Sequence, residues 1–141
     1  MVVGSTYILL RMTRMPLTLE KPKKKVVSAK SAAGNGEKLM AWRKGLGINR
    51  VTFAKVAHCS ERKLATYEKE AELPLPVRRQ TTEAVRLLKA LGEIITEEEL
   101  SAWLQKPNRG FGRRAPLAVI EAGETDLLWD MIHQIRQGAF A

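Results

Sequence analysis

The chain has little of the material that builds disulfide-linked, metal-dependent or membrane-spanning proteins. Among its 141 residues are one cysteine and two histidines. A single cysteine excludes an internal disulfide and a metal site of several thiolates, and it fits a reducing, cytoplasmic setting. Two histidines without clustered acidic partners argue against zinc. No apolar run approaches the roughly 20 residues of a membrane span, and residues 7–10 are too short and too poorly flanked for a signal peptide.

Positive charge, by contrast, is in excess and is unevenly distributed. The net charge of +9 comprises +6 from residues 1–36, +4 from residues 37–70 and −1 from residues 71–141. A basic first half suits neutralisation of nucleic-acid phosphates. Residues 1–35 lack helical or strand periodicity, so we expect a flexible basic arm. Whether this arm contacts DNA or is a solvated tail with a general basic bias stays open.

Apolar residues recur at helical spacing from residue 37 onward, and no segment alternates as a sheet strand would. The sequence therefore predicts an all-α fold. Thr96 and Glu99 have the spacing of a capping box, and Pro116 suits the first turn of a short helix that Gly123 ends. The other predicted helices span residues 37–44, 50–57, 61–70, 77–94, 97–104 and 125–137. The apolar stripe of the last helix comprises Leu127, Leu128, Met131, Ile132 and Ile135.

The best candidate for a domain boundary is the segment Leu73-Pro74-Leu75-Pro76. Its two prolines are expected to stop the preceding helix and to form a stiff extended link. The predicted organisation is therefore an arm over residues 1–35, a first helical domain over residues 36–75 and a second over residues 76–141.

Residues 49–68 carry the most informative pattern in the chain. Asn49 and Ser60 are each placed to cap a short helix by accepting from its free backbone N–H groups. Ile48 can pack on Phe53, four residues into the helix, as a hydrophobic staple. Two capped helices joined by a tight turn predict a helix-turn-helix DNA-binding motif. The remaining positions where the two helices must touch are Ala54, Ala57, Leu64 and Tyr67.

The second helix of this pair is the predicted recognition helix. Arg62 could pair with guanine edges, and Thr66 could contact a thymine methyl or a phosphate. Arg50, at the start of the first helix, and Lys63 are predicted phosphate contacts. The alternative is a set of packed helices whose polar side is merely solvated. The predicted DNA-binding residues are Arg50, Ser60, Glu61, Arg62, Lys63, Thr66 and Lys69.

The turn between these helices departs from the usual pattern, because most such turns have glycine where this chain has His58. Histidine tolerates the left-handed conformation better than most residues, though at a cost. His58 therefore puts full DNA affinity in question but not the fold. Cys59 beside it is expected to be a small buried residue, since a catalytic Cys–His pair would need a third, orienting group.

Several short motifs occur along the chain in an informative order. Residues 39–75 contain Arg43-Lys44, Leu46-Gly47-Ile48-Asn49, Phe53-Ala54, Ser60-x-x-x-Leu64-x-x-Tyr67-Glu68 and Leu73-Pro74. This set resembles the Xre-type helix-turn-helix repressors. The C-terminal half contains Ala102-Trp103-Leu104-x-x-Pro107-Asn108, Ala115-Pro116-Leu117, Ile120, Gly123 and Ile135-Arg136-Gln137-Gly138. That set resembles the toxin-binding domain of Xre/MbcA/ParS antitoxins. Together they cover about residues 37–141, and the departures are His58, Glu124-Thr125 and the short end after Gly138.

The resemblance implies a bacterial type II antitoxin that performs no chemistry itself. Its second domain would block the active site of a RES-domain toxin that degrades NAD or transfers ADP-ribose. Its first domain would repress its own operon as a homodimer, since operators commonly offer two half-sites about one DNA turn apart. A stand-alone repressor, whose C-terminal half only dimerises or senses a ligand, is the second hypothesis.

The C-terminal end offers residues for contact with a partner. Tryptophan and phenylalanine near a chain end are either core residues or interface anchors. We favour the core for Trp103 and Trp129 and an interface for Phe140. The basic loop at residues 109–114 could be an RNA-binding segment, a solvated turn or a toxin contact, of which the last two are favoured. The predicted toxin-binding residues are Arg113, Arg114, Trp129, His133, Arg136, Phe140 and Ala141.

An enzyme is the third hypothesis, and the sequence offers it no site. We find no candidate nucleophile, phosphate loop or metal cluster, and no cofactor is expected. The three acids at residues 97–99 are explained by the favourable position of negative charge in the first turn of a helix. The glycine pairs at residues 34–36 and 45–47 lack the strand and helix that a nucleotide-binding fingerprint requires.

Overall fold

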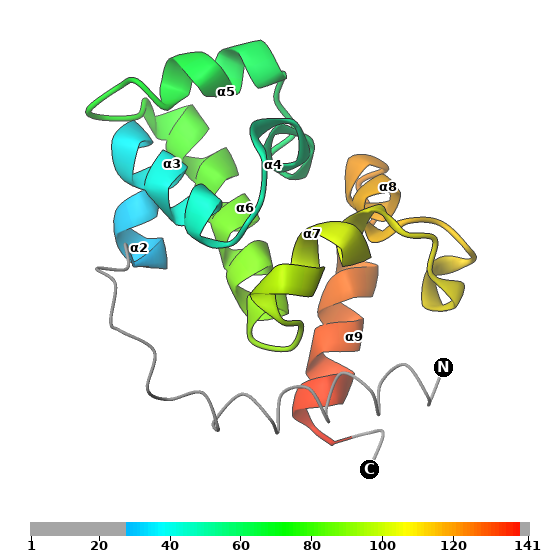
Figure 1. The fold of residues 1–141 in the computed structure, drawn as a ribbon. Helices are drawn as coiled ribbons and strands as arrows, with labels where there is room; N and C mark the ends of the chain where they lie inside the picture. Colours follow the sequence, from blue (N-terminus) through cyan, green and yellow to red (C-terminus); the bar gives the residue numbers. More distant parts are fainter. Residues whose placement is uncertain (1–27, 139–141) are drawn as a thin grey trace. The chain divides into compact units, whose positions relative to one another are not determined.

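The computed structural model of the chain describes residues 28–138, and within them every regular element is helical (Figure 1). The predicted all-α fold is thus confirmed for the described residues. No helix in this part of the chain is both long and apolar enough to cross a bilayer. The elements are α2 (Ala29–Ala32), α3 (Gly36–Gly45), α4 (Arg50–Val56), α5 (Glu61–Tyr67), α6 (Leu75–Gly92), α7 (Glu97–Gln105), the 3-10 helix η2 (Arg109–Phe111), α8 (Pro116–Glu121) and α9 (Asp126–Arg136).

The described residues form two compact units, which we name the N-terminal unit (residues 28–89) and the C-terminal unit (residues 90–138). The sequence-based boundary at residue 75 differs from this division, because most of α6 packs with the N-terminal unit. Leu75 begins α6 instead of forming an extended link. Pro76 lies in the first turn of α6, where a backbone N–H would have no acceptor within the helix, so its absence in proline costs no hydrogen bond.

The N-terminal unit is built on short capped helices around an apolar core. Asn49 accepts from the backbone N–H of Thr52 at 2.8 Å, and Ser60 accepts from that of Lys63 at 3.1 Å, as predicted for both caps. α5 lies at the outer edge of the unit, with α3 and α6 on its inner side (Figure 1). α5 ends at Tyr67, three residues earlier than the predicted limit of residue 70. The fully buried large side chains here are Leu39, Ile48, Phe53, Leu64, Leu73 and Leu88.

The prediction of a flexible arm is wrong for residues 28–35. Ser28 caps α2, and Ala32 is completely buried. The side-chain amide of Asn35 donates to the carbonyl of Ala71 at 2.7 Å, and the backbone N–H of Leu73 donates to that of Gly34 at 3.3 Å. One buried alanine gives no periodic signal, so the sequence pattern missed this segment. Residues 1–27, including the basic residues 21–25, lie outside the described part.

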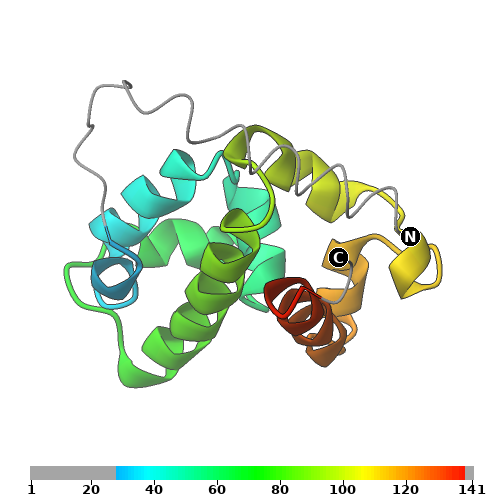
Figure 2. The same ribbon diagram turned by 90° about the horizontal axis from the view of Figure 1, so that it is seen from below.

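The C-terminal unit packs α7, η2, α8 and α9 together with the end of α6, and Figure 2 shows α9 nearly end-on beside α8. Pro116 begins α8 as predicted. Gly123 and Gly138 have φ of 81° and 71°, the left-handed conformation that ends a helix. The fully buried large side chains are Leu91, Leu100, Leu104, Ile120, Leu128 and Ile132.

Two details of the C-terminal unit differ from the prediction. Thr96 and Glu99 interact, but the Thr96 hydroxyl donates to the Glu99 carboxylate at 3.1 Å and makes no capping bond to a backbone N–H. In α9 only Leu128 and Ile132 are fully buried, whereas Leu127 is 38% exposed. The predicted stripe was wider than the surface that the neighbouring helices cover.

Candidate nucleic-acid interface

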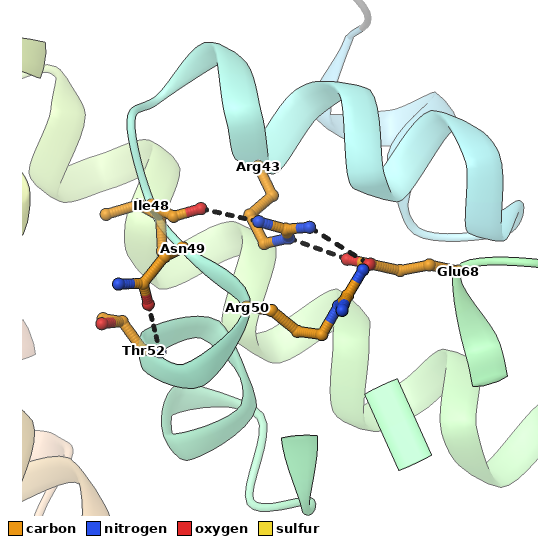
Figure 3. Close-up of polar contacts among 6 residues, drawn as sticks. All are labelled: Arg43, Ile48, Asn49, Arg50, Thr52 and Glu68. Carbon is orange, nitrogen blue, oxygen red and sulfur yellow. Dashed lines mark hydrogen bonds and ion pairs between the residues drawn. The ribbon is translucent and has the colours of Figure 1, made fainter. Parts of the chain in front are cut away.

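Three charged side chains meet at the end of α5 and join three helices of the N-terminal unit (Figure 3). Glu68 directly follows α5, and its carboxylate accepts from Arg43 of α3 at 2.7 Å and 3.1 Å. Arg50, the first residue of α4, donates from Nε to the same carboxylate at 3.1 Å. The side chains of Arg43 and Glu68 are only 4% and 2% exposed. We name these three residues the Glu68 centre.

Arg43 also fixes the entry to α4. Its Nη1 donates to the carbonyl of Ile48 at 3.0 Å, immediately before the Asn49 cap (Figure 3). Ile48 and Phe53 are both almost fully buried, as the predicted staple requires. No buried side-chain nitrogen or oxygen within residues 28–138 lacks a hydrogen-bond partner. The Glu68 centre is therefore fully satisfied, which is the condition under which buried charges are tolerated.

The turn between α4 and α5 places His58 in the left-handed region, with φ of 56°. This agrees with the expectation that the position suits glycine. The following amide, that of Cys59, donates to the carbonyl of Ala54 at 3.0 Å and closes the end of α4. Cys59 is half-buried, less than predicted. Burial raises the pKa of its thiol, against an opposing effect of nearby Lys63.

The outer side of α5 is polar and exposed, whereas Leu64 on its inner side is completely buried. The Thr66 hydroxyl donates to the carbonyl of Arg62 at 3.2 Å, within the helix itself. Ser60 is occupied by capping, so it is a structural residue whatever else it contacts. The predicted DNA-binding residues that lie exposed are Ser60, Glu61, Arg62, Lys63, Thr66 and Lys69.

Arg50 differs from the rest of the predicted set because it is partly tied down. Its Nε is occupied by Glu68, and its side chain is 39% exposed. The bond fixes the direction of the guanidinium, and within the described residues its terminal nitrogens make no hydrogen bond. Arg50 is therefore both part of the Glu68 centre and a candidate for contact with a ligand.

Gly36 allows the chain to pass close to the end of α5. Its backbone N–H donates to the carbonyl of Glu70 at 2.9 Å. A Cβ atom at this position would overlap the carbonyl oxygen of Tyr67 and lie 2.8 Å from that of Glu70. Any other residue would push α3 away from α5, and with it Arg43 from Glu68.

The residues predicted to bind a toxin are spread over the C-terminal unit. His133 and Arg136 are exposed on α9, and Arg136 pairs with Glu93 at 3.3 Å. Trp129 is half-buried with its ring 6.4 Å from that of His133, which places it between the core and interface alternatives. Trp103 is likewise half-buried and packs edge-on against Phe111. Phe140 and Ala141 lie outside the described residues.

The basic loop is a closed and well-connected turn. Asn108 and Arg114 form an isolated β-bridge, and the Asn108 side chain accepts from the Gly110 amide at 2.8 Å. Arg114 donates to Glu124 at 2.7 Å and 3.2 Å, which raises the pKa of Arg114 and lowers that of Glu124. Arg113 is exposed and left-handed, with φ of 66°. Arg113 is thus the more accessible of the two predicted arginines.

The sequence did not reveal the Glu68 centre. In the sequence analysis, Arg43 and Glu68 were only members of the motif set that resembles the Xre-type repressors. They are 25 positions apart. No local spacing rule connects them. A charged residue on an otherwise apolar helix face could indicate a buried ion pair, but this signal does not identify the second residue of the pair.

Comparison with protein-family models, with curated proteins and with solved structures finds no match for this chain. Within residues 28–138, no three His, Cys, Asp or Glu side chains are grouped so that they could hold a metal ion.

Proposed function

We propose that the N-terminal unit binds DNA in a sequence-specific manner, with α4 and α5 acting as a helix-turn-helix and α5 entering the major groove. The observation that carries this proposal is the combination of a buried Glu68 centre with a polar outer face on α5. The Glu68 centre holds α3, α4 and the end of α5 together. A rigidly held helix with free polar side chains is what base recognition requires.

Two residues of α5 suit contacts with bases. Arg62 is exposed, and a guanidinium can pair with both acceptors of a guanine edge. Thr66 has committed its hydroxyl hydrogen to the carbonyl of Arg62. Its methyl group makes no such commitment, and an exposed methyl-bearing side chain suits contact with the methyl group of thymine. These two residues are therefore proposed to determine sequence preference.

Three other cations suit contacts with phosphates. Lys63 is exposed in the first turn of α5, Lys69 is exposed two residues after its end, and Glu68 orients Arg50 at the start of α4. Phosphate contacts fix the orientation of a protein on DNA and supply most of the salt dependence of binding. We propose that Glu68 acts as a positioning residue for Arg50.

Binding to the DNA upstream of this protein's own gene tests the proposal, measured by fluorescence anisotropy against a random duplex. Arg62→Ala should cost about 1–3 kcal/mol on the preferred site and relax the preference at one position. Lys63→Ala should weaken both duplexes equally and reduce the salt slope by about one. Arg113→Ala removes the same charge from the C-terminal unit and serves as the matched control. Equal losses from Arg62→Ala on both duplexes would contradict base recognition.

We further propose that the chain is an antitoxin whose C-terminal unit blocks a RES-type toxin and whose N-terminal unit represses the shared operon. The resemblance of residues 37–141 to Xre/MbcA/ParS antitoxins supports it. The half-buried ring of Trp129 also supports it, since tryptophan is enriched among the residues that dominate protein interfaces, and the exposed side chain of Leu127 adds apolar surface. Both lie on α9, together with the predicted residues His133 and Arg136.

Co-expression with the product of the adjacent gene tests this second part. We expect that product to be toxic alone, to co-purify with this chain and to be neutralised by it. Deletion of residues 137–141 should weaken neutralisation if the end of the chain reaches the toxin. If the adjacent gene product is harmless and does not co-purify, the stand-alone repressor is favoured. That result would leave the proposed DNA binding uncontradicted.

A further inference from the structure

α7 carries opposite charges at its two ends. Glu97 and Glu98 are exposed in its first turn, and Lys106 is exposed directly after its last residue. The loop beyond adds Arg109 and Arg113, and no acidic residue occurs between Glu99 and Glu121. Glu98 and Lys106 have no ion-pair partner within residues 28–138. The described part of the chain therefore leaves both charges uncompensated.

Glu98 and Lys106 do not pair with each other in the described part of the chain. The backbone rises about 10 Å from Glu98 to Gln105 at about 1.5 Å per residue, and Lys106 continues beyond the helix in an extended conformation. An ion pair requires a nitrogen–oxygen distance of about 4 Å or less. Since nothing within residues 28–138 compensates either charge, a second molecule can do so.

The face of α7 that joins the two ends is exposed and narrow. Glu98, Ala102 and Gln105 follow one another at helical spacing, and all three are exposed. Leu100 and Leu104 on the opposite side are completely buried. Ala102 lies midway between Glu98 and Lys106, and its small side chain permits another helix to approach closely. An antiparallel copy of α7 centred on Ala102 would thus bring Glu98 opposite Lys106 twice.

We propose that this face of α7 binds the same face of a second copy of the chain, antiparallel, with Ala102 on the two-fold axis. Glu98 then pairs with Lys106 of the partner subunit, and the symmetry repeats the pair. Such an isologous contact closes on itself and yields a dimer, not a filament. Because a single short helix pairs through exposed charges, the association is weak and depends on salt.

The proposal names the surface by which two DNA-binding units are brought together. It does not depend on the proposed DNA binding, because self-association is measured without DNA. If the chain dimerises through α7 but does not bind DNA, only the proposed function is contradicted. A chain that binds DNA but is unaffected by charge changes on α7 would contradict this inference alone.

Sedimentation of the full chain at two salt concentrations tests the inference. The Debye length falls from about 30 Å at 0.01 M to about 3 Å at 1 M, so the wild-type dimer should dissociate in the high-salt sample. Glu98→Lys alone and Lys106→Glu alone should each raise the dissociation constant at least about tenfold, because like charges then face each other twice. The two variants mixed in equal amounts should form a heterodimer, since both contacts become complementary again. The double variant E98K/K106E should also regain self-association.

Glu97→Lys is the matched control. It removes the same favourable charge from the first turn of α7, but residue 97 lies about 100° around the helix from residue 98. It should leave the dissociation constant unchanged, and circular dichroism should show all variants folded. A wild-type chain that stays monomeric at low salt would overturn the inference. So would single variants that associate as the wild type does, or a mixture of them that stays monomeric.

Discussion

The two units of the molecule contain the same interaction in opposite surroundings. Arg43 and Glu68 in the N-terminal unit pair at 2.7 Å, and Arg114 and Glu124 in the C-terminal unit also pair at 2.7 Å. The first pair is 4% and 2% exposed, whereas the second is 41% and 46% exposed. Equal shortest distances therefore do not mean equal contributions to stability, because solvent screens the exposed pair, whereas each buried charge depends on its partner.

The difference also separates their roles. The buried pair joins α3 to the end of α5 and, through the Ile48 carbonyl, to the start of α4. The exposed pair connects the basic loop to Glu124, which lies in the segment between α8 and α9. We infer that the N-terminal unit relies on its ionic centre for the relative placement of helices. The C-terminal unit relies on its apolar core.

The largest expected effect comes from removing one partner of the buried pair. Glu68→Gln leaves Arg43 charged and buried, so the free energy of unfolding should fall by about 3–5 kcal/mol. Glu124→Gln, the matched change in the exposed pair, should cost far less, because solvent screens that pair. Urea denaturation of both variants measures the contrast. Equal losses would show that burial does not distinguish the two pairs.

A smaller effect is expected from closing the space between α3 and α5. Gly36→Ala places a methyl group against backbone carbonyls and should destabilise the protein by about 1–3 kcal/mol. Gly45→Ala, at the last residue of the same helix, meets no atom within 4 Å and should be neutral or stabilising. Thermal melts of the two variants check this. If both behaved alike, the close approach at Gly36 would not be a packing constraint.

An effect of about 1 kcal/mol on the free energy of unfolding is expected at the two residues other than glycine that have a left-handed conformation. His58 and Arg113 have φ of 56° and 66°. Glycine relieves the strain at either position, although part of the gain is offset by the greater freedom of the unfolded chain. We expect His58→Gly to stabilise the protein and preserve or improve DNA binding, and Arg113→Gly to leave DNA binding unchanged. His58→Val should be clearly destabilising, because a β-branched residue resists this conformation. A neutral valine variant would contradict the assigned conformation.

The smallest expected effect concerns pH. The Arg114 side chain lowers the pKa of Glu124 in the folded state relative to the unfolded state. Its contribution to stability is therefore present above the ordinary pKa of a glutamate and is lost as the pH falls through the folded value. The difference in stability between wild type and Glu124→Gln should shrink as the pH falls through this acidic range. A difference that stayed constant at acidic pH would show that the pair contributes nothing.

Local features of this fold were predictable from the sequence, and distant pairings were not. Asn49 and Ser60 were identified as caps because a capping side chain and the backbone N–H that donates to it lie three positions apart. His58 was identified because the turn demands a left-handed residue. The Glu68 centre and the close approach at Gly36 depend on residues that meet only after the chain has folded. The short helix α2 was missed because one buried residue, Ala32, holds it without any periodic pattern.

The central claim is that α5 of the N-terminal unit reads DNA. Footprinting of the region upstream of this protein's own gene, with excess competitor DNA, tests it most directly. We predict that the full chain protects a discrete site, that Arg62→Ala loses the protection and that Arg113→Ala retains it. No protected site, or a site that Arg62→Ala protects as well as the wild type does, would contradict the claim.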